Sequence, residues 1–210
     1  MKINKIINEA KRLLQENPYD EGHDLTHHLE VWGNAQDIAN NINIEVDKDA
    51  LYIACMWHDV VITDIEDRNF KQRGRIVDST SNYLEGLLRK DGFSDSFIDK
   101  TILAIRLHEY KRKPTTVEGK ILYDADKLEY IGLNRWKRIF HTLKTGKMSK
   151  IKFFIYKQAG KRYLKHLKEK YHFDYTRELH DERVKLILQD KEARQMAKEL
   201  GENLESILVG

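Results

Sequence analysis

The chain has 210 residues and a mass of 24.9 kDa, which is enough for one well-buried domain. Charged residues make up 34% of the chain, whereas it holds only 11 glycines and 2 prolines, a composition typical of helical proteins. The single cysteine, Cys55, excludes a disulfide framework within the chain, and no run approaches the roughly 18 apolar residues of a membrane span.

We therefore expect an all-α fold and a single domain over residues 1–210. The first residues are amphipathic and lack the apolar centre of a signal peptide, and the lone cysteine favours a reducing compartment, so we expect a cytoplasmic protein. The net charge of +3 is distributed unevenly along the chain. Residues 131–170 hold thirteen Lys or Arg and one acid, so this segment carries +12 and the rest carries −9.

Periodic apolar residues predict the first three helices. The first begins near Ile3 and ends before the stretch ENPYDEG, residues 16–22. The second is predicted to begin near Asp24 and to carry His27 on its apolar stripe. The third, DALYIACMWHD at residues 49–59, is apolar nearly all round, which predicts a place in the centre of the domain.

Further helices are predicted after a polar stretch at residues 61–75, which is expected to form a loop near the end of the third helix. Their patterns cover residues 77–88, 94–110 with a serine available as N-cap, and 117–132. The basic residues 134–170 are predicted to form two helices hinged near Gly146. A charged amphipathic helix is predicted from about Thr176 to Leu200.

Polar side chains continue three of the apolar stripes at four-residue steps: His27, His58, Asp59 and Asp126. A buried imidazole or carboxylate needs a partner, because an unpaired buried charge costs several kcal/mol. Imidazole nitrogens together with carboxylate oxygens suit Zn, Mn, Fe, Co or Ni better than Ca. The combination predicts a metal site.

Each of these residues could instead have a purely structural role, without binding a metal. A lone His27 is more often a core or capping histidine, and Asp124 and Asp126 in the sequence DADK suit a solvated helix face. An isolated His-Asp dipeptide carries little information, as the second such pair, His23-Asp24, illustrates.

Three motifs occur in order along the chain: HDLTHHLEV at residues 23–31, LYIACMWHDVV at 51–61 and ILYDADKLEYIG at 121–132. This ordered set resembles the HD-domain superfamily of metal-dependent phosphohydrolases over roughly residues 20–135. The resemblance implies an HD-like core at about 20–135, followed by a basic helical segment and C-terminal helices at about 136–210. The chain departs from the family pattern at Glu30, where the family often has Arg.

The resemblance implies four metal ligands, carried over residue by residue: His27, His58, Asp59 and Asp126. It also implies one divalent transition metal, which is Mn, Fe, Co, Ni or Zn, with Mg as a further candidate. In GHDLTHH, residues 22–28, we expect His23 and Asp24 to cap the helix or support the site. We expect His28 to be an edge residue.

The mechanism implied by the resemblance is attack of metal-bound water on phosphorus. Besides Asp59, two residues are candidate catalytic groups. His108 could donate a proton to the leaving oxygen or contact phosphate, and Asp124 could orient a ligand or accept a proton from water. Lys127 is the candidate substrate-binding residue. A packed His108 and a solvated Lys127 remain the structural alternatives.

The resemblance implies a small phosphorylated metabolite as substrate, with a nucleotide as the first choice. The basic segment, which could attract an anion, gives this expectation modest support. Aromatic residues interleaved with its charges could stack a base, although a helical core stripe is the commoner arrangement: Phe153, Phe154, Tyr156 and Tyr163. We expect no membrane and no nucleic acid as a partner, and the sequence leaves the oligomeric state open.

Four other interpretations compete with this one. A zinc protease would use the H-x-x-x-H spacing of His23 and His27 but needs Glu, where the chain has Asp24. A nucleic-acid-binding module would use the basic segment, and a ligand sensor would use the same site without turnover. A guanosine tetraphosphate hydrolase would need an acidic pair shortly after His-Asp, where the chain offers Asp64 at a different spacing.

Overall fold

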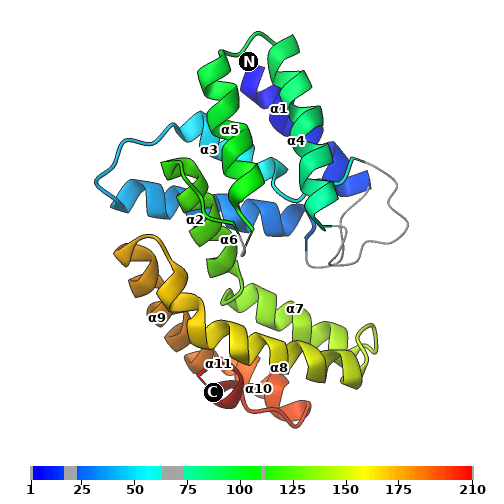
Figure 1. Ribbon diagram of the computed structural model, residues 1–210. Helices are drawn as coiled ribbons and strands as arrows, with labels where there is room; N and C mark the ends of the chain where they lie inside the picture. The colour runs from blue at the N-terminus through cyan, green and yellow to red at the C-terminus, as the bar shows by residue number, and fades with distance from the viewer. Residues whose placement is uncertain (1, 17–22, 63–72, 110–111, 210) are drawn as a thin grey trace. The chain divides into compact units, whose positions relative to one another are not determined.

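The computed structural model describes residues 2–16, 23–62, 73–109 and 112–209. Eleven α-helices, one short 3-10 helix and no strand are found in these ranges, which confirms the predicted all-α fold (Figure 1). None of the described helices is long and apolar enough to span a membrane. Most of the predicted loop at 61–75 and the break at 16–22 lie outside the described residues, as does Asp64.

The chain divides into two compact units, Met1–Asp126 (unit 1) and Lys127–Gly210 (unit 2). The single domain expected from the sequence stays a prediction, because the compactness of each unit does not show whether it folds without the other.

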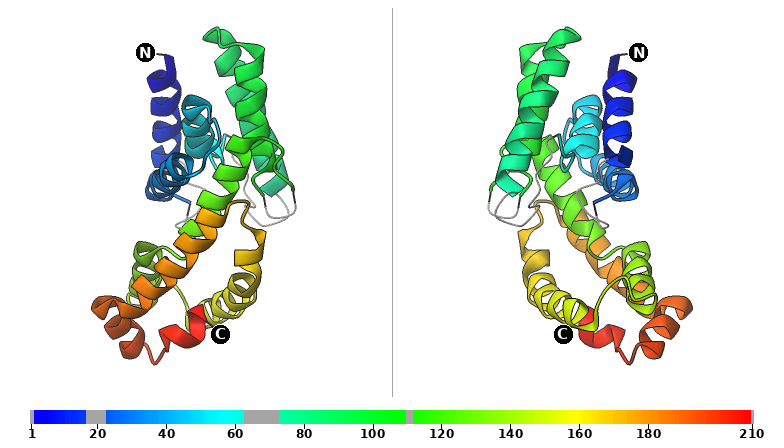
Figure 2. Two further views of the ribbon diagram at one scale, coloured as in Figure 1. Left: turned by 90° about the vertical axis from the view of Figure 1, so that its left-hand side faces the viewer. Right: turned by 90° about the vertical axis from the view of Figure 1, so that its right-hand side faces the viewer.

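Unit 1 is built around one central helix. Its elements are α1 (Lys2–Glu16), α2 (Leu25–Asn41), α3 (Lys48–Trp57), α4 (Arg73–Lys90), α5 (Asp95–Leu107) and the first ten residues of α6 (Val117–Glu129). Helix α3 packs against α1, α2 and α5, and α4 lies beside α5 (Figures 1 and 2). Nearly every side chain from Ala50 to Trp57 is fully buried, which confirms the central position predicted for this segment.

Short polar side chains set the starts of three helices in unit 1. Asp24, Asp47 and Ser94 have extended backbone, and each side chain accepts a hydrogen bond from the amide three residues later. Such N-caps satisfy amides that have no partner within the helix. The predicted starts near Asp24 and Ser94 are therefore confirmed.

Two hydrogen bonds hold α6 against its neighbours. The amide Nδ2 of Asn34 on α2 donates to the carbonyl oxygen of Ala125 at 3.0 Å. At the other end of α6, a carboxylate oxygen of Glu118 accepts from the backbone amide of Asp47 at 3.0 Å. The first of these bonds fixes α6 against α2 at the residue immediately before Asp126.

Unit 2 has its own apolar core. Its elements are the end of α6, α7 (Leu133–Lys144), α8 (Lys150–Leu167), the 3-10 helix η1 (Lys168–Lys170), α9 (Asp174–Gln189), α10 (Lys191–Glu199) and α11 (Leu204–Leu208). Trp136, Phe140 and Leu167 are fully buried in this core. Gly146 has φ +74° in the turn between α7 and α8, which confirms the predicted pair of helices hinged there.

The prediction of one continuous helix from about Thr176 to Leu200 is wrong. The structure has two helices, α9 and α10, separated at Asp190. Asp190 has ψ 120°, and its side chain accepts from the amide of Ala193 as the N-cap of α10. A side chain that caps the next helix competes with continuation of the first, and this local competition ends α9.

Candidate metal centre

The first candidate ligand is positioned by the start of α2. The carboxylate of Asp24 accepts from the backbone amide of His27 at 3.0 Å, so His27 stands in the first turn of the helix. Its side chain is only 1% exposed and points to the interior of unit 1. The capping role expected for Asp24 is confirmed.

Two further imidazoles stand at the C-terminal ends of helices. His58 is the C-cap of α3, and its Nδ1 lies 2.8 Å from the carbonyl oxygen of Cys55. His108 is the C-cap of α5, and its Nδ1 lies 2.5 Å from the carbonyl oxygen of Ile105. Donation from Nδ1 to these carbonyls leaves Nε2 of each ring as the lone-pair nitrogen, the arrangement in which histidine binds metals.

Three candidate ligand atoms converge in the interior of unit 1. Nε2 of His27 lies 3.2 Å from Nε2 of His58. The carboxylate oxygen Oδ1 of Asp126 lies 3.5 Å from the first of these nitrogens and 3.8 Å from the second. One polar side chain from each of three helices, α2, α3 and α6, therefore reaches the same point in the interior.

The carboxylate of Asp59 lies beside this point and contacts three imidazoles. Its Oδ2 is 3.8 Å from Nε2 of His58 and 3.7 Å from Nε2 of His23, and its Oδ1 is 3.6 Å from Nε2 of His108. Asp59 is 4% exposed and His108 is fully buried. All four ligands implied by the sequence thus lie together, with His108 next to them.

These donors fit a divalent metal. Two ligands each about 2.1 Å from one metal are about 3.0 Å apart at a right angle and about 3.4 Å apart at the tetrahedral angle. The observed separations of 3.2 and 3.5 Å for His27 Nε2 fall close to these values. Two groups of donors each lie within 4.8 Å of one another: His27, His58 and Asp126, and His23, His27 and Asp59.

Burial favours the neutral form of two imidazoles in this region, those of His58 and His28. It lowers the pKa of His58 well below the ordinary histidine value, although Asp59 opposes the shift. It also lowers the pKa of His28 to about 3, assisted by repulsion from His27. Neutral imidazole is the metal-binding form, so the electrostatics of the cluster favour a cation from outside the chain over protons.

His28 is not the edge residue that the sequence predicted. Its side chain is fully buried, its Nδ1 lies 2.9 Å from the carbonyl oxygen of Asp24, and its ring centroid is 4.6 Å from that of His58. The prediction was wrong because the first turn of α2 is covered on two sides, which a single apolar stripe does not reveal.

His23 was underestimated as a site residue. The sequence assigned it a capping or supporting role, whereas the structure places it among the candidate donors. His23 precedes the N-cap Asp24, so helical spacing does not place it, although its ring centroid lies 5.1 Å from that of His27.

The other predicted residues differ in how close they come to this cluster. Asp124 is fully buried on α6, but a two-residue step turns it about 160° around the helix from Asp126. Lys127 directly follows Asp126 on α6 and is partly buried. Their roles, like those of the four ligands, stay predictions.

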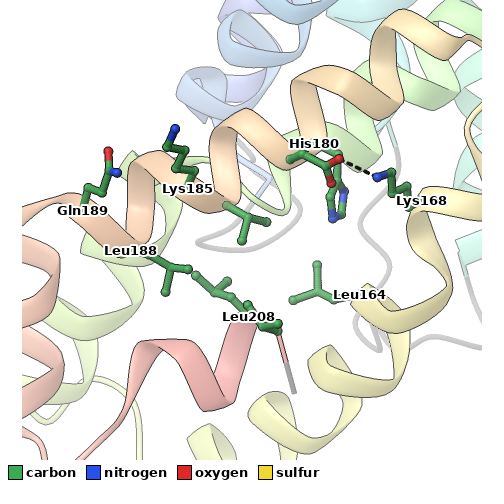
Figure 3. Close-up of a pocket in the computed structure, with 10 residues that line it drawn as sticks. Leu164, Lys168, His180, Lys185, Leu188, Gln189 and Leu208 are labelled. Atoms are coloured by element: carbon green, nitrogen blue, oxygen red, sulfur yellow. Dashed lines mark hydrogen bonds and ion pairs between the residues drawn. The ribbon is translucent and has the colours of Figure 1, made fainter.

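Unit 2 contains a pocket that is an alternative candidate site (Figure 3). It has a volume of about 490 Å³, and its walls are largely apolar, including Leu164, Leu188 and Leu208. His180 faces it, and an ion pair between Lys168 and Asp181 lies at its side. No group of metal ligands was found around it among the described residues, so we assign the candidate centre to unit 1.

Comparisons with known proteins found a matching family model and similar solved structures. The family model described as HD domain matches residues 24–131, which include His27, His58, Asp59 and Asp126. A crystal structure of a predicted HD superfamily hydrolase from an uncultured Thermotogales bacterium is 26% identical, with a TM-score of 0.60, covering 95% of this chain and 91% of that one. Bacillus subtilis YpgQ in complex with ADP is 24% identical, with a TM-score of 0.61 and coverage of 95% and 97%. A search of curated proteins gave no match.

Proposed function

Since the chain belongs to the HD-domain family and is a metal-dependent phosphohydrolase, we propose that it hydrolyses a phosphoester or phosphoanhydride bond of a nucleotide. The observation that carries the proposal is the convergence of His27 Nε2, His58 Nε2 and Asp126 Oδ1 beside the carboxylate of Asp59. The location that we propose is the cytoplasm.

We propose that four residues hold one divalent metal: His27, His58, Asp59 and Asp126. When bound, the metal would lower the pKa of a coordinated water and neutralise charge on the phosphoryl oxygens. The hydrogen bond from His58 Nδ1 to the carbonyl of Cys55 fixes the ring orientation and tautomer. The chemistry of the donor set allows Mn, Fe, Co, Ni or Zn, and Mg less readily.

His108 is the proposed proton donor to the leaving oxygen. Its Nδ1 is committed to the carbonyl of Ile105, and its Nε2 lies 3.6 Å from Oδ1 of Asp59. To act as this donor, His108 would have to bind a proton at Nε2, the ring nitrogen that faces the cluster. Asp124 is the proposed orienting carboxylate on α6, and Lys127 is the proposed contact for a substrate phosphate.

Two observations support a nucleotide as substrate. The protein YpgQ, which shares the fold, was crystallised in complex with ADP. The basic composition of residues 131–170 favours polyanions in the surroundings of the chain. The proposal covers nucleoside mono-, di- and triphosphates and leaves the scissile bond to experiment.

The test is release of phosphate or of the shortened nucleotide by metal-stripped protein to which Mn, Co, Ni, Zn or Mg is added singly. We expect metal-dependent turnover that falls at least about a hundredfold in Asp126→Ala and in Asp59→Ala, since loss of groups that merely support a ligand already costs 10–100-fold. The control, Asp181→Ala, removes an exposed carboxylate of unit 2 and should retain full activity.

Metal content distinguishes the possible failures. If both ligand variants keep full metal content and activity, the assigned centre is wrong. If the wild type binds metal but hydrolyses no nucleotide, the nucleotide proposal is wrong, and binding of the same nucleotides would identify a sensor.

A further inference from the structure

The cations of the basic segment form two groups, those with an ion-pair partner in unit 2 and those without one among the described residues. Residues 131–168 hold twelve Lys or Arg and no acid. Six of the cations form ion pairs within unit 2: Arg135 and Arg138 with Glu129, and Lys137, Lys144, Lys157 and Lys168 with acids between Asp181 and Glu202. About half of the positive charge is therefore neutralised within the unit.

The other group surrounds the beginning of α8. Among the described residues, no acidic side chain pairs with Lys147, Lys150 or Lys152, and all three are exposed. Further along α8, Lys161 and Arg162, four and five residues after Lys157, are likewise outside every ion pair described. This cluster of uncompensated charge is a property of the fold and not of the composition alone.

Three large apolar side chains lie among these lysines. Ile151, Phe154 and Ile155 are 75%, 55% and 63% exposed. Their i, i+3 and i+4 spacing puts them on one face of α8, opposite the face that buries Phe153 and Leu164 in the core. We name Lys147, Lys150, Ile151, Lys152, Phe154 and Ile155 the α8 face.

The lysines flank the apolar residues on both sides. Lys150 and Lys152 precede and follow Ile151, so each is turned about 100° from it around the helix. An apolar ridge between rows of lysine has the composition of helices that lie in the interface of an anionic membrane. The ridge is convex, because it is the outer side of a packed helix.

Other partners fit this face less well. In a symmetric contact with a second copy, the same lysines would meet each other and repel. Lysine is depleted at protein–protein interfaces, where arginine, tyrosine and tryptophan are enriched. Aliphatic side chains such as Ile151 and Ile155 neither stack on bases nor pair with phosphates, which disfavours nucleic acid.

We propose that the α8 face docks on an anionic lipid surface, with Ile151, Phe154 and Ile155 at the boundary of the acyl chains and the lysines among the headgroups. The sequence-based expectation of no membrane partner rested on the lack of a spanning run. Surface docking through three side chains requires no such run. The proposal is independent of the activity of unit 1.

The test is cosedimentation of the full chain with vesicles made of equal parts phosphatidylglycerol and phosphatidylcholine, compared with vesicles of phosphatidylcholine alone. We expect binding only to the anionic vesicles and weakening with added salt. The triple variant Lys147→Gln, Lys150→Gln, Lys152→Gln should weaken binding roughly a hundredfold.

The matched control removes three paired lysines instead, as Lys137→Gln, Lys144→Gln, Lys168→Gln, and should weaken binding much less. The apolar variant Phe154→Ser, Ile155→Ser should also reduce binding, whereas Leu186→Ser at an exposed site on α9 should not. Circular dichroism establishes that each variant is folded.

Three outcomes would overturn the proposal. The first is no vesicle binding at low salt, and the second is equal binding to both vesicle types. The third is equal weakening by the two lysine triples, because net charge alone would then explain the effect. Binding to duplex DNA that depends on Lys150 but not on Phe154, without vesicle binding, would instead identify a nucleic-acid surface.

Discussion

The buried ionisable groups of the cluster in unit 1 are imidazoles and carboxylates that face one another, whereas the buried acid Glu129 in unit 2 faces guanidinium groups. In unit 1, Nε2 of His27, His58 and His108 all point at carboxylates or at each other. In unit 2, Glu129 is 1% exposed and is bound by Arg135 and by Arg138, the latter at 3.1 Å.

The two units therefore differ in the source of the positive charge that compensates their buried carboxylates. Burial of a carboxylate is tolerated when a cation and hydrogen bonds offset the lost hydration. Unit 2 supplies both partners from its own chain. In unit 1 the imidazoles and carboxylates of the cluster form a ligand set that suits a divalent cation from solution, so the stability of unit 1 should depend on metal.

The largest expected effect on stability comes from removing Glu129, the buried acid of unit 2. Glu129→Ala leaves the largely buried Arg135 without its carboxylate and should lower the free energy of unfolding by about 3–5 kcal/mol. Urea denaturation measures this loss, and added metal should not restore it. Glu192→Ala, at an exposed partner of Lys137, is the matched control. A loss as small as that of the control would show that the pair is not structurally important.

The second test measures how a divalent metal changes the free energy of unfolding. A divalent metal at 100 times its dissociation constant should raise the free energy of unfolding by about 2.7 kcal/mol. His58→Ala should abolish this response, while His180→Ala in unit 2 should keep it. A response that survives in His58→Ala would place the metal elsewhere.

The features that were predicted correctly from the sequence depend on interactions between residues close together in the chain. The starts of helices at Asp24 and Ser94 depend on one side chain and the next three residues, and the central α3 depends on an apolar composition all round. The break at Asp190 escaped prediction because one more acid in a highly charged segment does not differ in pattern from a solvated residue.

The site was predictable only in part. The sequence identified His27, His58, Asp59 and Asp126 as polar residues on apolar stripes, but their convergence depends on the packing of α2, α3 and α6. The burial of His28 is likewise a consequence of tertiary packing and not of its own helix. Composition also cannot separate paired from unpaired lysines, so the α8 face emerged only from the structure.

The third test uses pH on metal-free protein. Burial lowers the pKa of His28 from 6.5 to about 3, so between these values the unfolded chain binds a proton that the folded chain does not. The free energy of unfolding should therefore fall as the pH is lowered below 6.5, by up to about 1.4 kcal/mol per pH unit. Above pH 6.5 both states are neutral at this site, and the contribution is constant.

The matched variant for this test is His28→Leu, which cannot titrate. Urea denaturation across the same pH range should give a slope smaller by the equivalent of one proton. An unchanged slope would show that His28 is not kept neutral by the fold.

The smallest expected effect comes from an exposed ion pair of unit 2. Nζ of Lys168 lies 2.5 Å from Oδ2 of Asp181, but the two side chains are 45% and 62% exposed (Figure 3). Asp181→Ala should change the free energy of unfolding by less than about 1 kcal/mol, with a further decrease at high salt. Urea denaturation at two salt concentrations measures this. If the loss matched that of Glu129→Ala, proximity rather than burial would determine the strength of charge pairs in unit 2, and the contrast between the units would no longer rest on burial.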